Sequence, residues 1–332
     1  MVRGPIAAVL VLAYAVASTA SCTPEEGRTV ARATDAGPID TMRPDVARDA
    51  VNIAEVGTTA TGGHVVPPSL TAEGIDDSFG DHVAYAPIGK PIGRLFVLFP
   101  DAQRKPAQYD RVLRVAATAG YHAIGLAYPN AKSIDAICGS DASCYASARL
   151  EIVDAKDRTS AIAIGRANCI ESRLLTLLDL LDLGWPSESW ANYLDDTSAI
   201  WSTIAFAGHG DGGGQAATIA SNRSVARVVF FSSPSDEIAG SPVPWVSAAH
   251  TTASALYFGI SHASESRHDA HLRAFTALGL DPTHEVTTTV TPSTGPFGID
   301  AFFGATALDA YTPLDADGKP LLASEWNLVI GP

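Results

Sequence analysis

The residues best suited to chemistry lie in and after a turn built from small side chains. In Ile204 to Gln215, IAFAGHGDGGGQ, His209 and Asp211 stand among glycines directly after a short apolar run. Two further acids and a histidine follow later apolar runs in the same way: Asp236, Glu265 and His262. Carboxylates can act as nucleophiles or as general acids and bases, and histidine can act as a base, so this set could support hydrolysis.

The turn also predicts the elements that would position these side chains. The apolar run 202–207 stops at Gly208, and small residues continue until the helix-like AATIASN begins. This pattern predicts a strand, a sharp turn and a helix. In folds of alternating strands and helices, sites form at the carboxyl ends of the strands, which is where all these side chains would lie.

The rest of the chain repeats the alternation. Apolar runs predict strands at 94–99, 121–127, 225–231, 255–260 and 285–290, with an edge strand at His82 to Pro87. Helical spacing marks 106–119, 168–183 and 268–278, and most of 131–200 is expected to be helical. These elements predict one α/β domain with a mostly parallel, doubly wound sheet and helices on both faces.

The composition fits a folded protein with no affinity for nucleic acid. The chain has 332 residues, of which 46% are hydrophobic, and five tryptophans, which is ample for a core. The net charge of −14 and the lack of any Lys/Arg cluster argue against binding to phosphate backbones. No cofactor is expected.

The N-terminus predicts export. Arg3 is followed by an apolar run, Ile6 to Ala17, which is too short to span a bilayer. Thr19-Ala20-Ser21-Cys22 then resembles a bacterial lipobox, apart from Thr19. We expect a lipoprotein signal peptide at 1–21, a lipid anchor on Cys22 at the bacterial cell envelope, a flexible tether at 22–60 and the domain at 61–332. Cleavage after Ala20 and secretion as a soluble protein is the alternative, and no other contact with a membrane is expected.

The remaining cysteines predict one disulfide. Cys138 and Cys144 are six residues apart around Gly139, and disulfides persist outside the cytoplasm. Cys169 is left over, and we expect it to be buried at the start of a helix. No C-x-x-C and no nearby pair of histidines supports a metal site.

Several segments together resemble secreted members of the α/β-hydrolase superfamily. They span about 85–330 in order: GRLFVLFP, GYHAIGLAYPN, GHGDGGGQAA, VARVVFFSSPSD, and ALYFGISH followed by an acid. The resemblance implies an α/β-hydrolase fold with a GHSQGGG-type nucleophile elbow at 208–212. It also implies a glycine-rich oxyanion loop after the first strand and a histidine near Pro296-Phe297-Gly298.

The catalytic positions depart from that pattern. Gly210 stands at the serine position, Asp101-Ala102-Gln103 replaces the oxyanion loop, and no histidine follows His284. A carboxylate at Asp101 would repel a developing oxyanion, and a glycine relaxes a strained elbow. The three departures together predict a catalytically impaired or non-catalytic protein that keeps its cleft to bind a small molecule or a protein.

Two other functions remain open. A serine-independent hydrolase could use Asp211, Asp236, Glu265 or His262, although Asp211 lies one residue past the tip of the turn. Gly208, Gly210 and Gly213 also match the dinucleotide pattern G-x-G-x-x-G, but at least two predicted strands precede this lone match. The histidines and acids at 265–271 are expected to form a solvated helix start, without a metal.

Overall fold

The computed structural model describes residues 53–196, 198–295 and 300–331, which belong to a unit spanning Thr41–Pro332. The predicted signal peptide, Cys22, most of the predicted tether and the Pro296-Phe297-Gly298 motif lie outside the described residues. In the part of the chain that is described, no helix is both long and apolar enough to cross a membrane.

A mostly parallel sheet forms the centre of the unit. Within the described residues it has nine strands, in the spatial order β1 (Gly57–Thr58), β2 (His64–Val66), β3 (His82–Tyr85), β5 (His122–Gly125), β4 (Leu95–Phe99), β6 (Ile204–His209), β7 (Arg227–Phe231), β10 (Tyr257–His262) and β11 (Glu285–Thr288). The pairs from β5 to β11 are parallel, whereas β1, β2, β3 and β5 pair antiparallel in that order. A separate antiparallel ribbon joins β8 (Glu237–Ile238) and β9 (Ser241–Pro242).

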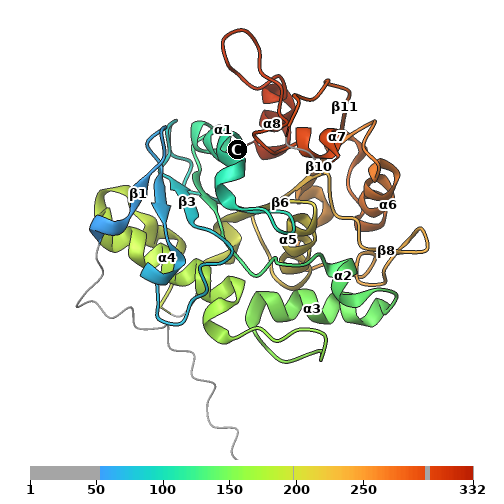
Figure 1. Cartoon of the computed structure of the whole chain (residues 1–332), viewed down its shortest axis with the longest axis horizontal. Coiled ribbons are helices and arrows are strands. Elements are labelled where there is room, and N and C mark those ends of the chain that lie inside the picture. Colours follow the sequence, from blue (N-terminus) through green and yellow to red (C-terminus); the bar gives the residue numbers. More distant parts are fainter. Residues whose placement is uncertain (1–52, 197, 296–299, 332) are drawn as a thin grey trace, which may run out of the picture. The chain divides into compact units, whose positions relative to one another are not determined.

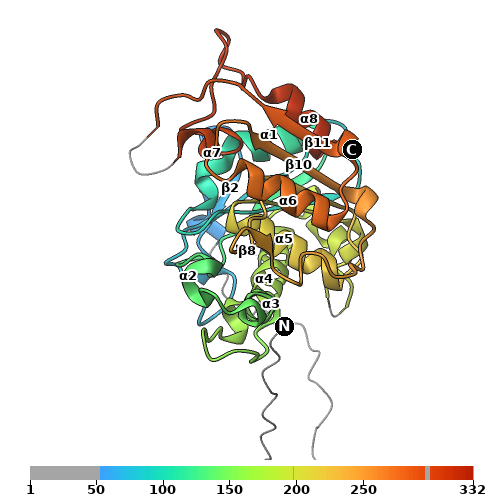
Figure 2. The ribbon, with the colours of Figure 1, turned by 90° about the vertical axis from the view of Figure 1, so that its right-hand side faces the viewer.

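Helices cover both faces of this sheet (Figures 1 and 2). They are α1 (Asp110–Thr118), α2 (Ile134–Cys138), α3 (Ala142–Asp154), α4 (Ile170–Gly184), α5 (Asp211–Asn222), α6 (His268–Leu278), α7 (Ala301–Ala305) and α8 (Ala323–Ile330). One face packs against α1 and α8, and the other packs against α3, α4, α5 and α6. Alternate residues of β4 point into the two cores, with Phe96 and Leu98 on the first side and Val97 on the second.

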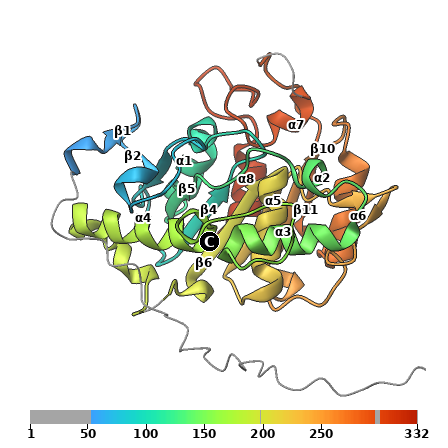
Figure 3. The ribbon, with the colours of Figure 1, turned by 60° about the horizontal axis from the view of Figure 1, so that its bottom comes forward.

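The strand order gives the fold class. Parallel neighbours need crossover connections, and α1, α5 and α6 supply them between β4 and β5, β6 and β7, and β10 and β11. The result is the predicted α/β-hydrolase fold in a single domain. The predicted helical middle of the chain is also present, because α2, α3 and α4 lie in it, with α3 and α4 along the same side of the sheet (Figure 3).

The prediction of an edge strand at His82 to Pro87 is wrong. β3 is an interior strand, paired with β2 on one side and with β5 on the other. β1 and β2 have two and three residues, which is too short to show an apolar period in the sequence. The sheet begins at Gly57, inside the range predicted as tether, and Tyr85 Oη anchors the β1–β2 turn through Thr59 and Thr61 at 2.8 and 2.6 Å.

Candidate functional site

The turn between β6 and α5 consists of one glycine. β6 ends at His209 and α5 begins at Asp211, with Gly210 between them at φ 54° and ψ −121°. Residues with a Cβ rarely adopt this combination of φ and ψ. A Cβ at Gly208 would overlap the backbone of Gly212 and Gly213, so strand and helix are in direct contact. The glycines are required by this close packing.

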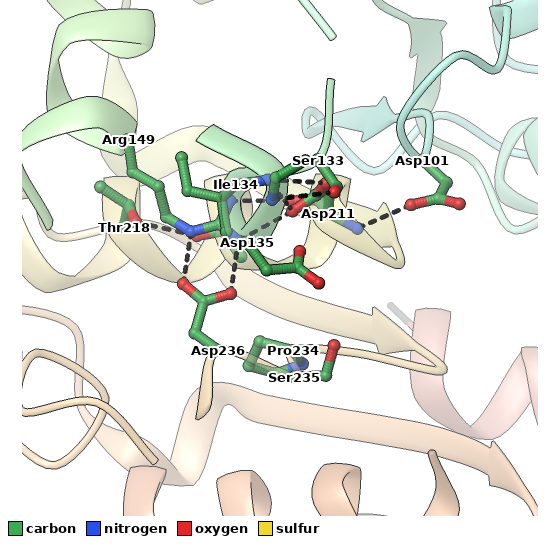
Figure 4. A network of polar contacts seen from close by, with 12 residues as sticks. Asp101, Ser133, Ile134, Asp135, Arg149, Asp211, Thr218, Pro234, Ser235 and Asp236 are labelled. Carbon is green, nitrogen blue, oxygen red and sulfur yellow. Dashed lines mark hydrogen bonds and ion pairs between the residues drawn. The ribbon is translucent and has the colours of Figure 1, made fainter. Parts of the chain in front are cut away.

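The carboxylate of Asp101 lies over this turn. Asp101 follows β4, and its Oδ1 accepts a hydrogen bond of 2.9 Å from the backbone N–H of Asp211 (Figure 4). A Cβ built on Gly210 would lie 2.5 Å from Asp101 Cγ and closer still to Oδ1. The carboxylate therefore fills the space of a side chain at residue 210. It also occupies the N–H after the elbow, which in α/β hydrolases serves the oxyanion.

A chain of hydrogen bonds fixes Asp101 and the end of β6. Tyr109 Oη accepts from the N–H of Asp101 at 3.0 Å and donates to Nδ1 of His209 at 3.1 Å. Nε2 of His209 then donates to the carbonyl of Phe303 at 3.1 Å. Burial lowers the pKa of His209 to about 3, so the ring is neutral. With both nitrogens occupied, His209 is a packing residue and has no lone pair to offer the cleft.

Arg149, from α3, binds two acids behind the turn. Its Nε and Nη2 donate to Asp236 at 2.6 and 2.5 Å, and Nη2 also donates to Asp211 at 3.1 Å (Figure 4). Trp245 Nε1 donates to Asp236 at 3.1 Å, and the N–H of Ile134 lies 3.2 Å from Asp211 Oδ2. Because Asp236 takes two short bonds from Arg149 and Asp211 takes one longer bond, the guanidinium neutralises Asp236 more fully than Asp211.

This arrangement raises the pKa of two carboxyl groups. Burial raises the pKa of Asp211 to about 7, against the opposing effect of Arg149 and with the help of the charges on Asp101 and Asp236. Burial also raises the pKa of Asp101, although the Asp211 N–H favours its ionised form. Acids this close titrate as a coupled group. The site therefore carries less negative charge in acid than at alkaline pH.

Asp101 and Asp211 line a cleft of about 290 Å³. The lining consists of Asp101, Ala102, Ser133, Asp135, Gly210, Asp211, Ser235, Ser266, Arg267, Asp300 and Phe303. Its cation, Arg267, already donates to Asp135 at 3.0 Å and to Ser235 Oγ at 2.8 Å. Four carboxyl groups and three hydroxyls thus make the cleft rich in hydrogen-bond acceptors.

Of the four groups that the sequence suggested for a serine-independent hydrolase, Asp211 alone lines this cleft. Asp236 is 4% exposed and is held by Arg149. His262 is buried, with Nδ1 accepting from the N–H of Ser264 at 3.0 Å and Nε2 donating to the carbonyl of Val290 at 3.0 Å. Glu265 is also buried and accepts from the N–H of His262 at 3.1 Å. These three groups hold the loops that surround the cleft.

The expected oxyanion loop is a different structure. Ala102 lines the cleft, but Gln103 has a φ of 61° and faces the neighbouring loop. Its N–H donates to the carbonyl of Asn130 at 2.8 Å, and its Nε2 donates to the carbonyl of Ala131 at 3.3 Å. Gln103 therefore belongs to the support of the Asp101 loop.

The segment after β11 brings an acid and an aromatic ring to the place where the resemblance implies a histidine. Asp300 caps α7 by accepting from the N–H of Phe302 at 3.0 Å, and it accepts from the N–H of Ser266 at 2.7 Å. The Phe303 ring lies 4.1 Å from the ring of His209. A Cβ at Gly210 would also be 2.9 Å from Phe303 Cζ. Among the described residues, no histidine lines the cleft.

The predicted solvated helix start at 265–271 is only partly correct. Asp269 is exposed and His268 is half-buried, but Glu265 and His271 are buried with Oε1 and Nε2 3.7 Å apart. Periodicity could have indicated this for His271, because it shares a helix face with the apolar Ala274, Phe275 and Leu278.

Sequence reasoning missed most of the cleft wall. Asp135, Arg267, Asp300 and Phe303 belong to no motif, and Arg149 lies in a helix without a clear apolar face. Nothing in the sequence marks these residues as neighbours.

The cysteines are arranged as predicted. Cys138 and Cys144 form a disulfide that ties the end of α2 to the first turn of α3, and Cys169 is free and buried at the N-cap of α4. Within the described residues, no group of three or more His, Cys, Asp or Glu side chains could hold a metal ion.

Comparisons with known proteins add little to this description. No family model matches the sequence, and no curated protein matches it. Similar solved structures include an α/β serine hydrolase homologue from Coxiella burnetii (11% identity, 71% of this chain and 90% of that chain, TM-score 0.36). They also include a dienelactone hydrolase from Anabaena variabilis (18% identity, 75% of this chain and 90% of that chain, TM-score 0.37). A third is a cold-adapted esterase from an Arctic intertidal metagenomic library (12% identity, 63% of this chain and 76% of that chain, TM-score 0.33). At these TM-scores the likenesses carry no argument, and the fold class rests on the strand order of the chain itself.

Proposed function

We propose that this chain is an exported α/β-hydrolase-fold protein that does not hydrolyse esters through a serine triad and instead binds a ligand in its cleft. The observation that carries the proposal is the Asp101 carboxylate over Gly210, bonded to the Asp211 N–H. A substrate carbonyl would meet no nucleophilic hydroxyl at the turn. The N–H that should stabilise its oxyanion is bound to a carboxylate of the protein.

The lining favours a ligand that donates hydrogen bonds. The carboxyl groups of Asp101, Asp135, Asp211 and Asp300 accept hydrogen bonds and attract positive charge, and Phe303 offers an aromatic ring. We therefore propose a small amine or a polyhydroxylated molecule as the ligand. A carboxylate or phosphate would face several like charges.

The same charges disfavour the two other functions. A phosphate at the start of α5 would have to displace Asp101, so the glycine turn does not support nucleotide binding. A hydrolase based on Asp211 is disfavoured because Asp211 is bonded to Arg149 and Ile134. Asp101, its neighbour in the cleft, already accepts from the Asp211 N–H, and Asp236, Glu265 and His262 do not line the cleft.

Export and lipid anchoring rest on the N-terminal sequence. The disulfide between Cys138 and Cys144 supports an oxidising compartment. Labelling with palmitate that depends on Cys22 would establish the anchor, and equal labelling of a Cys22→Ser variant would refute it.

An ester assay tests the catalytic part of the proposal. The wild-type protein should show no turnover of short p-nitrophenyl esters above the buffer rate. Gly210→Ser should show none either, because among the described residues no histidine lines the cleft, and His209, beside the turn, has both ring nitrogens bonded. Turnover by the wild-type protein that survives Asp211→Asn and Asp101→Asn would point to a contaminant. Turnover lost in either variant would refute the proposal.

A matched set of four-carbon compounds tests the ligand class. In thermal shift and calorimetry, 1,4-diaminobutane should bind most tightly, 1,4-butanediol weakly, and succinate not at all. Asp135→Asn should weaken binding of the diamine, whereas Asp315→Asn, in the exposed segment 314–319, should not. Preferential binding of succinate would contradict the electrostatic argument.

A further inference from the structure

Two buried polar groups face each other beneath one wall of the cleft. Glu265 lies in the loop after β10, and His271 lies in α6. Glu265 Oε1 and His271 Nε2 are 3.7 Å apart, and both side chains are 0% exposed. Nε2 of His271 and Oε2 of Glu265 have no hydrogen-bond partner, and 3.7 Å is too long for a hydrogen bond between Oε1 and Nε2. Buried polar atoms rarely stay unpaired, so this pair requires a physical explanation.

The fixed neighbours determine which atoms carry hydrogen. His271 Nδ1 lies 3.1 Å from the carbonyl of Pro234, which can only accept, so Nδ1 carries a proton and donates. Nε2 of a neutral His271 is then an acceptor. Glu265 Oε1 already accepts from the N–H of His262 at 3.1 Å. Two acceptors would therefore face each other in a buried space unless one of the two groups carries a proton.

The surroundings decide where that proton resides. Burial raises the pKa of Glu265 to about 7, helped by the charge of Asp300 and opposed by the nearby Ser232 hydroxyl and the N–H of His262. Burial lowers the pKa of His271 to about 4, with Arg267 and His268 acting in the same direction and the Pro234 carbonyl opposing. His209, on β6, is also close enough to interact with His271. Below neutrality the carboxyl group thus keeps the proton and the ring stays neutral.

We propose that the carboxyl group of Glu265 holds one buried proton opposite Nε2 of His271 and that this proton positions the Ser266–Arg267 wall of the cleft. Glu265 immediately precedes this wall, in which the N–H of Ser266 donates to Asp300 at 2.7 Å. Arg267 reaches across the cleft to Asp135 on α2 and to Ser235. His271 holds the segment after β7, because its Nδ1 donates to the carbonyl of Pro234, the residue before Ser235. The pair therefore joins two segments that line the cleft.

Loss of the proton would change this wall. Once Glu265 ionises, a buried carboxylate faces the lone pair of Nε2, and the repulsion is relieved if the 263–267 loop moves outward into water. Glu265 and His271 are positioning residues in this account, since neither lines the cleft. The inference rests on the proposed function only in treating the cleft as a ligand site. Its tests use no ligand, so the two can fail separately.

Spectroscopy of the wild-type protein tests the buried proton directly. Asp211 also holds a proton at pH 5.5, so we expect the protonated-carboxyl infrared band to be weakened in Glu265→Gln and not abolished. The difference between the two proteins should disappear with a midpoint near pH 7. Over the same range, nitrogen-15 spectra should show His271 protonated at Nδ1 only. The Ser266 N–H resonance should shift with the same midpoint, while that of Leu126, bonded to Leu98 in the sheet at 3.0 Å, should not.

The pH dependence of unfolding is a second test, because residues with a merely structural role would not change it. A carboxyl group whose pKa rises from 4.5 to about 7 on folding makes the unfolding equilibrium constant increase roughly 30-fold between pH 5.5 and pH 8. Glu265→Gln should remove that increment, and Glu325→Gln on α8 should leave it intact. A doubly protonated His271 beside an ionised Glu265 at pH 5.5, or a Ser266 resonance that ignores pH, would overturn the proposal.

Discussion

Placing a serine at residue 210 should destabilise the protein, and removing the Asp101 carboxylate should reverse most of that loss. The serine Cβ would lie 2.5 Å from Asp101 Cγ and 2.9 Å from Phe303 Cζ, which real side chains do not tolerate. Asp101 cannot retreat easily, because Tyr109 Oη holds its N–H at 3.0 Å and Asn130 Nδ2 holds its carbonyl at 2.8 Å. The carboxylate must therefore rotate away from the turn.

The magnitude follows from two contributions. A residue with a Cβ at φ 54° and ψ −121° costs about 1–3 kcal/mol in backbone strain. Rotation of Asp101 also breaks its hydrogen bond from the Asp211 N–H, and a bond to a charged group contributes about 1.5–3 kcal/mol. We expect Gly210→Ser to lower the free energy of unfolding by roughly 3–5 kcal/mol.

A double-mutant cycle separates these contributions. In Asp101→Ala/Gly210→Ser only the backbone strain and part of the Phe303 contact remain, so the coupling between the two sites should be about 2 kcal/mol in favour of the double variant. Urea unfolding at pH 7 measures all four proteins, and Gly62→Ser, at another glycine with positive φ but open space around it, is the matched control for strain alone.

Two outcomes would refute this reasoning. If Gly210→Ser costs no more than Gly62→Ser, the space over the turn is not occupied as described. If the two substitutions are additive within error, Asp101 is not the group that excludes a side chain from residue 210.

Three other perturbations test the parts around the turn. Arg149→Met leaves Asp236 and Asp211 without their cation and should lower the free energy of unfolding in urea by about 3–5 kcal/mol. The control Arg158→Met breaks the more exposed pair with Asp154 and should lower it by less than about 1 kcal/mol. The pKa of Asp211 rises on folding from 3.8 to about 7, so the native state keeps a proton that the unfolded chain releases. Stability should be greatest below about pH 4 for this group and fall by roughly 4 kcal/mol as the pH rises to 7, and Asp211→Asn should flatten the pH profile of the melting temperature. Replacing Cys138 and Cys144 together by serine should cost about 2 kcal/mol at equilibrium, and an equal loss in wild-type protein after reduction would assign it to the disulfide.

The sequence was sufficient for the sheet and for the turn because both follow local rules. Strands buried on both faces are continuous apolar runs, as in Leu95–Phe99, and the helix His268–Leu278 was bounded correctly by its apolar spacing and by Gly279. The turn could be found because only glycines permit the contact between β6 and α5. Short antiparallel strands such as Gly57–Thr58 carry no such signal, since their place depends on pairing with distant residues.

The cleft itself could not be predicted in the same way. Asp236 was recognised as a polar residue at a strand end, but its role depends on Arg149, which lies 87 positions away in the sequence. Glu265 and His271 looked like members of a solvated helix start, and their burial follows from the way α6 packs against the loop after β7. Side-chain partners across different loops leave no spacing in the sequence.

The contact between Asp101 and Gly210 also links the three departures from the serine-hydrolase pattern. In the sequence, the residues at the serine, oxyanion-loop and histidine positions are three separate departures. In the structure, Asp101 and Phe303 both fill the space over the turn, so residue 210 cannot carry a serine while either keeps its position. Conversely, the N–H of Asp211 at the start of α5 would lack a hydrogen-bond partner with glycine at residue 210, and Asp101 supplies that partner. The three departures are thus parts of one steric arrangement, and serine-triad chemistry at this turn would require changes in three loops at once.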